Sequence, residues 1–214
     1  MKKQLVLALA LAGAPIAASA AELSYSFIEA GYAQLNQELP HVDLGGGAVA
    51  QIGDIEASGV QVSGSIEMGA SFYLFGGYKS GSDDVVVTSN IPGFRPVSVD
   101  IDLTQFNAGL GYHHGLSERA DLITEISYIA TEAEVAGSSS DADDARVAVG
   151  VRGLMTDNFE GWLKANYTDG DAYDGEFSAT VGAQFKFNRT WGIVGEAEFG
   201  ESSSQYMVGV RARF

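Results

Sequence analysis

The chain has 214 residues, among them 27 glycines, four prolines and no cysteine, and 46% of its residues are apolar, which is one domain's worth of chain. Its 12 basic and 28 acidic residues give a formal charge of −16. A surface with this charge repels nucleic acid and other anionic partners. An exported chain without cysteine cannot form disulfides, so hydrogen bonds between its strands must hold it together.

The first 20 residues have the order of a secretory signal peptide. Lys2 and Lys3 precede an apolar run, 5–11, and the small residues Ala18-Ser19-Ala20 follow it. We expect a signal peptide at 1–20 that is cleaved after Ala20, and a mature domain at 21–214. The mature domain keeps 10 basic against 28 acidic residues, a formal charge of −18. No stretch approaches 18 consecutive apolar residues, so the sequence predicts no transmembrane helix.

Ten short segments of alternating apolar and polar residues follow, separated by clusters of Gly, Ser, Asn and Asp. They are 24–36, 55–67, 71–81, 99–113, 121–134, 145–154, 159–168, 176–187, 191–200 and 205–214. Each is near the 9–11 residues or so that a tilted strand needs to cross a membrane. The sequence therefore predicts an all-β fold, a closed antiparallel transmembrane β-barrel of ten strands. Eight strands are the alternative if 24–36 or 176–187 is misread.

The connections between these segments alternate in length. The short ones are near 68–70, 114–120, 155–158 and 188–190, and the mostly longer, polar or acidic ones are near 37–54, 82–98, 135–144, 169–175 and 201–204. Short periplasmic turns alternating with longer extracellular loops are the rule for outer-membrane barrels. An even number of strands also places both termini on the periplasmic side, so the pattern predicts a location in the bacterial outer membrane.

Aromatic residues recur on the faces expected to meet lipid. Phe159 and Tyr167 are eight residues apart on such a face, and so are Trp191 and Phe199. Eight residues of a tilted strand span about 20 Å along the membrane normal, close to the height of the apolar band, about 25 Å. The aromatics therefore fall at both membrane interfaces; the alternative is the core of a soluble sandwich. The predicted aromatic girdles comprise Tyr32, Phe72, Tyr78, Tyr112, Tyr128, Phe159, Tyr167, Phe187, Trp191, Phe199, Tyr206 and Phe214.

The opposite faces carry charges of both signs, which can neutralise one another inside a barrel. The predicted lumen charge network comprises Glu29, Glu125, Arg146, Arg152, Lys164, Glu196, Glu198, Arg211 and Arg213. The lumen of a ten-stranded barrel is wider than one that side chains fill completely and narrower than an open channel. We interpret the network as a structural plug, with the gate of a narrow pore as the alternative.

The last segment, 205–214, shows the two faces most clearly. Tyr206, Val208, Val210, Ala212 and Phe214 alternate with polar residues and glycine, and Arg211 and Arg213 lie on the polar face. This ending is typical of the closing strand of an outer-membrane barrel. We expect the two arginines to pair with Glu196, Glu198 and Glu29.

Several motifs together resemble those of the small outer-membrane barrels of xanthomonads known as activators of plant immunity, and more loosely those of the outer membrane protein X type. They are Glu29-Ala30-Gly31-Tyr32, Leu74-Phe75-Gly76-Gly77-Tyr78, Gly109-Leu110-Gly111-Tyr112, Gly150-Val151-Arg152-Gly153, Asn158-Phe159-Glu160-Gly161 and Phe187-Asn188-Arg189-Thr190-Trp191-Gly192. Because these are scaffold motifs, the resemblance implies the barrel and no particular activity. It also implies a link with virulence, biofilm and vesicle release.

Histidines and acidic clusters are the candidates for chemistry. His41 lies near the outside beside Asp43, without the paired carboxylates that an enzyme at the outer rim would need, and is interpreted as a solvated loop residue. His113 and His114 point to opposite faces at the periplasmic end, as interface residues. Asp169, Asp171 and Asp174 resemble the start of a calcium loop but lack its bidentate glutamate. The sequence therefore predicts no catalytic residue and no cofactor, and only these weak candidates for a metal site.

The sequence as a whole predicts a non-enzymatic small outer-membrane barrel that contributes to envelope integrity, adhesion or host and surface interaction through its extracellular loops. A narrow porin-like channel for small solutes or ions is the alternative, and a rim enzyme acting on peptide or lipid A is a third possibility. The expected partners are outer-membrane lipids and lipopolysaccharide, the barrel-assembly machinery through the C-terminal strand, and a host or surface ligand, but not nucleic acid.

Overall fold

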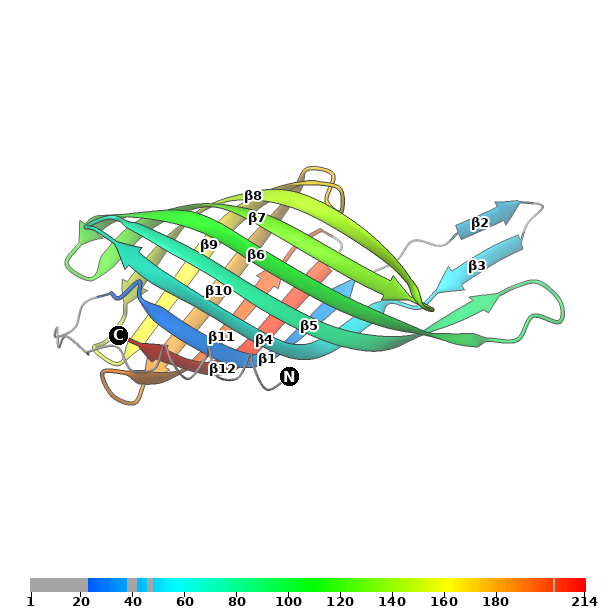
Figure 1. Cartoon of the computed structure of the whole chain (residues 1–214), viewed down its shortest axis with the longest axis horizontal. Coiled ribbons are helices and arrows are strands. Elements are labelled where there is room, and N and C mark those ends of the chain that lie inside the picture. Colours follow the sequence, from blue (N-terminus) through cyan, green and yellow to red (C-terminus); the bar gives the residue numbers. More distant parts are fainter. Residues whose placement is uncertain (1–22, 38–41, 46–47, 202) are drawn as a thin grey trace.

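The computed structural model describes residues 23–37, 42–45, 48–201 and 203–214. In this part of the chain twelve strands form one antiparallel sheet, and ten of them close into a barrel because β1 (Phe27–Gln37) pairs with β12 (Ser203–Arg213) (Figure 1). The predicted ten-stranded barrel is confirmed, and the eight-stranded alternative is wrong. The predicted signal peptide, residues 1–20, lies outside the described residues.

The strands between β1 and β12 pair in chain order. The barrel strands are β4 (Ile55–Met68), β5 (Phe72–Ser89), β6 (Val97–Ser117), β7 (Ala120–Val135), β8 (Ser138–Leu154), β9 (Phe159–Gly170), β10 (Glu176–Lys186) and β11 (Trp191–Phe199). The closing register is continuous, from Phe27 opposite Arg213 to Gln37 opposite Ser203. Among the described residues, no helix is long and apolar enough to cross a membrane.

The outward face of the barrel is apolar. Aliphatic side chains such as Val60, Leu74 and Val208 are 61%, 45% and 56% exposed. Ten of the twelve predicted girdle aromatics are exposed on this face as well, and Phe159 and Phe214 are half-buried. A contiguous apolar exterior of this kind is unfavourable in water, whereas in a bilayer it meets hydrocarbon.

Two hairpins continue well beyond the lipid-facing band on the extracellular side. β5 and β6 remain paired to Val87 opposite Val97, and β7 and β8 remain paired to Val135 opposite Ser138. The predicted loops at 82–98 and 135–144 are therefore too long, because only 90–96 and 136–137 lie outside strands. Backbone hydrogen bonds extend these ribbons without the apolar alternation that marks a strand in sequence. Ala136 and Gly137, with φ of 52° and 81°, close the second ribbon in a two-residue turn.

The predicted loop 37–54 also contains two short strands, β2 (Val42–Gly45) and β3 (Ala48–Ile52). β3 pairs with the outer end of β5, so β2, β3 and the outer ends of β5 and β6 form an outer sheet beyond the barrel (Figure 1, right). Where β4, β5 and β6 leave the barrel, their inner face carries a buried apolar cluster of Ile55, Ala57, Val85 and Ile101. This cluster stabilises the start of the projection away from lipid.

Candidate functional site in the barrel lumen

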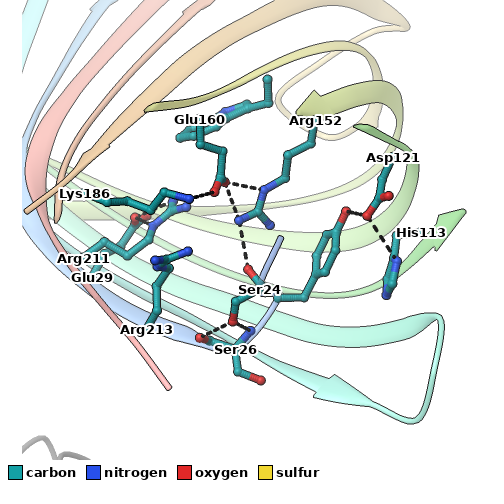
Figure 2. Close-up of polar contacts among 12 residues, drawn as sticks. Ser24, Ser26, Glu29, His113, Asp121, Arg152, Glu160, Lys186, Arg211 and Arg213 are labelled. Atoms are coloured by element: carbon teal, nitrogen blue, oxygen red, sulfur yellow. Dashed lines mark hydrogen bonds and ion pairs between the residues drawn. The ribbon is translucent and has the colours of Figure 1, made fainter. Parts of the chain in front are cut away.

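The inward face of the barrel carries the charged side chains, and the most buried of them lie near the periplasmic end. The Glu160 carboxylate is fully buried, 2.6 Å from Arg152 and 3.7 Å from Lys186, and Glu29 pairs with Arg211 at 2.6 Å (Figure 2). We call these five residues the periplasmic cluster. Each buried charge there has an opposite charge beside it, which offsets the cost of removing it from water.

The segment Leu23–Ser26, here called the N-terminal plug, enters the lumen beside this cluster instead of extending β1 as predicted. Arg152 Nη2 donates to the Ser24 carbonyl oxygen at 2.9 Å, and the Tyr25 hydroxyl donates to Asp121 Oδ2 at 2.8 Å (Figure 2). The Tyr25 ring is only 2% exposed and stacks on His113, with ring centroids 4.1 Å apart. The plug therefore fills part of the periplasmic end of the lumen.

Further toward the outside, charged pairs cross the lumen between strands far apart in the sequence. Lys164 Nζ lies 3.2 Å from Glu125 Oε2, and Arg146 Nη2 lies 3.1 Å from Glu198 Oε1. Tyr73 donates to Glu125 at 2.8 Å, and the Trp162 indole donates to Glu196 at 2.7 Å. These contacts tie β5, β7, β8, β9 and β11 together through the interior.

The structure corrects part of the expected pairing. Arg211 pairs with Glu29, but Glu196 and Glu198 bond to Trp162 and Arg146 and not to the C-terminal arginines. Arg213 donates instead to the Arg189 carbonyl oxygen at 3.2 Å. The reason is the stagger of the barrel, which brings together inward residues that are not direct neighbours across adjacent strands.

Several residues of the lumen were missed by the sequence reasoning. Lys79, Trp162 and Tyr73 share the parity of inward residues on their own strands, so strict alternation alone identifies them. Tyr25 lies in the predicted segment 24–36 with the parity of Glu29, although in the structure it precedes β1. His113, interpreted as an interface residue, points inward to Asp121 Oδ2 at 3.4 Å, while His114 is exposed on the other face.

Other candidate residues lie at or beyond the outer rim. His41 is outside the described residues. Asp171 Oδ2 accepts a hydrogen bond from the Asp143 amide at 3.3 Å, and Asp169 and Asp174 are exposed. Within the described ranges, no three histidine, aspartate or glutamate side chains are grouped so as to hold a metal ion. Burial raises the pKa of the Tyr173 hydroxyl, so this residue of the rim is neutral at physiological pH.

A cavity of about 330 Å³ occupies the lumen on the extracellular side of the plug. Its lining reaches from Tyr25 and Tyr73 to Leu103 and Tyr173 at the outer end, and it includes polar and apolar side chains. Its volume is at the lower end of the range for small-molecule sites, which is about 300–1,000 Å³. The cavity is therefore large enough for a small solute.

The chain matches no protein-family model, and no curated protein sequence matches it either. Solved structures of outer-membrane barrels do resemble it. The translocator domain of the autotransporter NalP from Neisseria meningitidis has a TM-score of 0.54 at 11% identity, over 100% of this chain and 95% of that domain. OprG from Pseudomonas aeruginosa has a TM-score of 0.52 at 12% identity, over 92% of this chain and 99% of OprG. The β domain of the Bordetella autotransporter BrkA has a TM-score of 0.54 at 10% identity, over 90% of this chain and 100% of that domain. At these identities the likeness shows the fold alone, that of a small outer-membrane β-barrel.

Proposed function

We propose that the protein is a non-enzymatic outer-membrane barrel that makes contacts outside the cell through its outer sheet and its β7–β8 ribbon. The observation that carries this proposal is the length of the strands. β6 has 21 residues, whereas β11 crosses with nine. Of the twelve extra residues, 113–117 lie at the periplasmic end. At about 3.3 Å per residue and a tilt of about 40°, the other seven or so project about 18 Å beyond the membrane.

The projection offers a surface suited to contact with a partner. Ile91, Phe94 and Val97 at the tip of the β5–β6 ribbon are 43%, 41% and 51% exposed, and they lie far outside the apolar band. Aromatic and aliphatic side chains at such a position favour binding to another surface over solubility. The resemblance of the sequence motifs to those of xanthomonad barrels linked to virulence is part of this proposal.

The outward face of the ribbons is strongly acidic just beyond the girdle. Its exposed carboxylates include Asp84, Asp100, Asp102, Glu132, Glu134 and Asp141. They lie where lipid headgroups and lipopolysaccharide would surround the barrel. We propose that divalent cations, loosely held, bridge these carboxylates to the phosphates of the outer leaflet.

Insertion through the barrel-assembly machinery would depend on β12, whose register with β1 closes the barrel.

The lumen favours a structural role over catalysis. Its carboxylates are held in ion pairs or by Tyr and Trp donors, and His113 is stacked on Tyr25 at the plugged end. Acid–base catalysis needs such a group within reach of a substrate proton. These paired lumen charges and His113 are therefore assigned to barrel stability.

Shortening the ribbon tests the proposed surface contact. Replacing residues 86–98 by Asn-Gly keeps Val85 opposite Val99 and supplies the turn that a two-residue hairpin prefers. Cells displaying this variant are expected to lose adherence to host cells and to plastic, down to the level of cells that lack the protein. The control variant Asp157→Asn, in a periplasmic turn, is expected to adhere like the wild type. Full adherence by a folded, heat-modifiable shortened barrel would refute the proposal.

The lumen cavity favours a second candidate function, a narrow channel for small solutes. Planar-bilayer recordings decide between the two. If the N-terminal plug closes the lumen, the wild type gives no stable steps of single-channel current. Tyr25→Ala removes the stacked ring and then gives small current steps. Stable steps from the wild type that change in Arg152→Ala would instead support a channel.

A further inference from the structure

Lys79 differs from the other lumen cations in its surroundings. It points inward from β5, and its cross-strand neighbours are Gln61 on β4 and Gln105 on β6. Its ammonium donates to the Oε1 atom of Gln205 on β12, on another part of the lumen wall. Lys79 is thus surrounded by three amide side chains, and all four residues line the lumen cavity.

The other inward lysines and most inward arginines have a carboxylate beside them. Lys164 lies 3.2 Å from Glu125, Arg146 lies 3.1 Å from Glu198, and Arg152, Lys186 and Arg211 belong to the periplasmic cluster. Among the described residues, no carboxylate forms an ion pair with Lys79. Glu198 and Glu196 act on Lys79 electrostatically from farther away. An anion bound beside the ammonium would add the direct contact that these carboxylates do not make.

The wall next to Lys79 is poor in side chains. Gly59 lies opposite Gly81 in the register of β4 and β5, and both glycines line the lumen cavity. A Cβ at Gly59 would collide with the Ser80 carbonyl oxygen, so a side chain there is strongly disfavoured. This bare wall leaves room for a molecule to reach the Lys79 ammonium.

Glu196 and Glu198, which line the same cavity, accept hydrogen bonds from other side chains of the lumen. Glu198 accepts from Arg146 and, at 2.8 Å, from the Ser178 hydroxyl, while Glu196 accepts from the Trp162 indole at 2.7 Å. Phe75, Leu103 and Ile129 supply apolar wall in the same cavity. A cationic centre between amides, next to an apolar wall, suits a molecule with one carboxylate and a small apolar or aromatic body.

We propose that Lys79, with Gln61, Gln105 and Gln205, forms a subsite in the lumen that binds the carboxylate of a small organic anion. The ammonium pairs with the carboxylate, and the glutamine amides donate further hydrogen bonds to its oxygens. The apolar wall contacts the remainder of the molecule. This subsite lies inside the barrel and does not depend on the proposed surface contact, so the two can fail separately.

Three probes of similar shape and different charge test the proposal, namely benzoate, neutral benzamide and cationic benzamidine. Each is titrated into the refolded full-length barrel in detergent micelles, and the backbone amide resonances are followed by NMR. Benzoate is expected to shift the resonances of residues 77–81 and of Gln205 in a saturable manner. Benzamide and benzamidine are expected to leave them unshifted. Saturable binding of all three alike, or no saturation with benzoate, overturns the proposal.

Variants of Lys79 locate the binding. Lys79→Gln removes the charge and retains a donor for Gln205, and it is expected to weaken benzoate binding about tenfold or more, because a charge-assisted hydrogen bond is lost. Lys79→Arg is expected to keep binding within a few-fold. Arg119→Gln, which removes an exposed cation from the periplasmic end, is the matched control and is expected to bind like the wild type. Unchanged affinity in Lys79→Gln refutes the assignment; if that variant does not fold, the probe series and Lys79→Arg still decide it.

Discussion

At the residue scale, Arg152 connects the barrel wall with the N-terminal plug. Its guanidinium reaches Glu160 on β9, the Ser24 carbonyl oxygen of the N-terminal plug and the Tyr25 ring, whose centroid is 4.6 Å away. Arg152 and Glu160 are both buried. One side chain therefore joins the barrel wall to the plug, and its loss leaves a buried carboxylate and a plug with fewer contacts.

We predict that Arg152→Met lowers the free energy of unfolding by about 3 kcal/mol, the cost of breaking a buried ion pair by removing one partner. Within the described part of the chain, Lys186 at 3.7 Å is then the one ion-pair partner that Glu160 retains. Urea unfolding of the protein refolded into lipid vesicles measures the change. The control is Arg119→Met, because Arg119 and Asp157 form an ion pair of which the side chains are 50% and 75% exposed. Its loss is expected to cost less than about 1 kcal/mol. Equal losses in the two variants would contradict this account of Arg152.

Alternation along the strands predicts which residues face the lumen but not which residues bond to one another. Glu198 is an inward residue whose partner is Arg146, 52 positions away in the sequence. The partner depends on strand tilt and stagger, which are properties of the closed barrel and leave no local mark in the sequence. Tyr25 lies within the predicted segment 24–36, but the structure begins β1 only at Phe27. Alternation alone therefore does not predict that the chain before Phe27 turns into the lumen.

At the element scale, the barrel strands were predictable and their outer ends were not. Within the apolar band each strand must alternate, because one face meets lipid and the other meets the lumen. Beyond the band that requirement ends, and the run Ser138-Ser139-Ser140-Asp141 resembles a loop in composition although it is paired with β7. Backbone hydrogen bonds and the tight turn at Ala136-Gly137 hold this ribbon, and neither leaves a hydrophobic pattern.

The β5–β6 ribbon carries a testable electrostatic feature. Asp84 lies directly opposite Asp100, and a hydrogen bond between the two carboxyl groups raises the pKa of Asp84 above its ordinary value. A raised pKa means that the paired ribbon holds this proton more tightly than the open chain does. The shared proton therefore stabilises the ribbon at low pH, and its contribution is lost as the pH rises through the raised pKa.

Carboxyl NMR titration of the refolded protein measures this effect. We predict that Asp84 titrates above about 3.9, the ordinary value for aspartate, and that its midpoint falls in Asp100→Asn, because the amide has no ionisable proton to share. Asp157→Asn, at the other end of the barrel, is the control and is expected to leave the midpoint of Asp84 unchanged. If Asp100→Asn leaves it unchanged too, the two carboxyl groups do not interact across the ribbon.

At the scale of the whole molecule, one register decides whether the sheet is a barrel. All other neighbouring barrel strands follow one another in the chain, apart from the β2–β3 insertion, but β1 and β12 come from opposite ends. The sequence predicted this closure from the strand count and from the two-sided pattern of 205–214. It could not predict the N-terminal plug, because the plug acquires its contacts only when the closed wall surrounds it.

A disulfide across the β1–β12 seam tests the closure directly. Ala33 lies opposite Met207, both on the inner face, and the chain has no cysteine of its own. Directly opposed residues of antiparallel strands have Cα atoms about 4.5–5.5 Å apart, within the range that a disulfide spans. We predict that Ala33→Cys with Met207→Cys crosslinks on mild oxidation of the folded protein. Because the bond joins the two ends of the chain, the boiled protein then migrates faster on a gel until it is reduced.

The control pairs Ala33→Cys with Ala148→Cys. Ala148 is a buried inward residue of β8, a strand that is not adjacent to β1 in the sheet. This pair is not expected to crosslink. A seam pair that stays reduced while the barrel is folded, or a control pair that crosslinks as readily, would mean that β1 and β12 do not meet in the register that closes the lumen. The plug and the Lys79 subsite both need a closed lumen around them, so this result would also remove the basis for both.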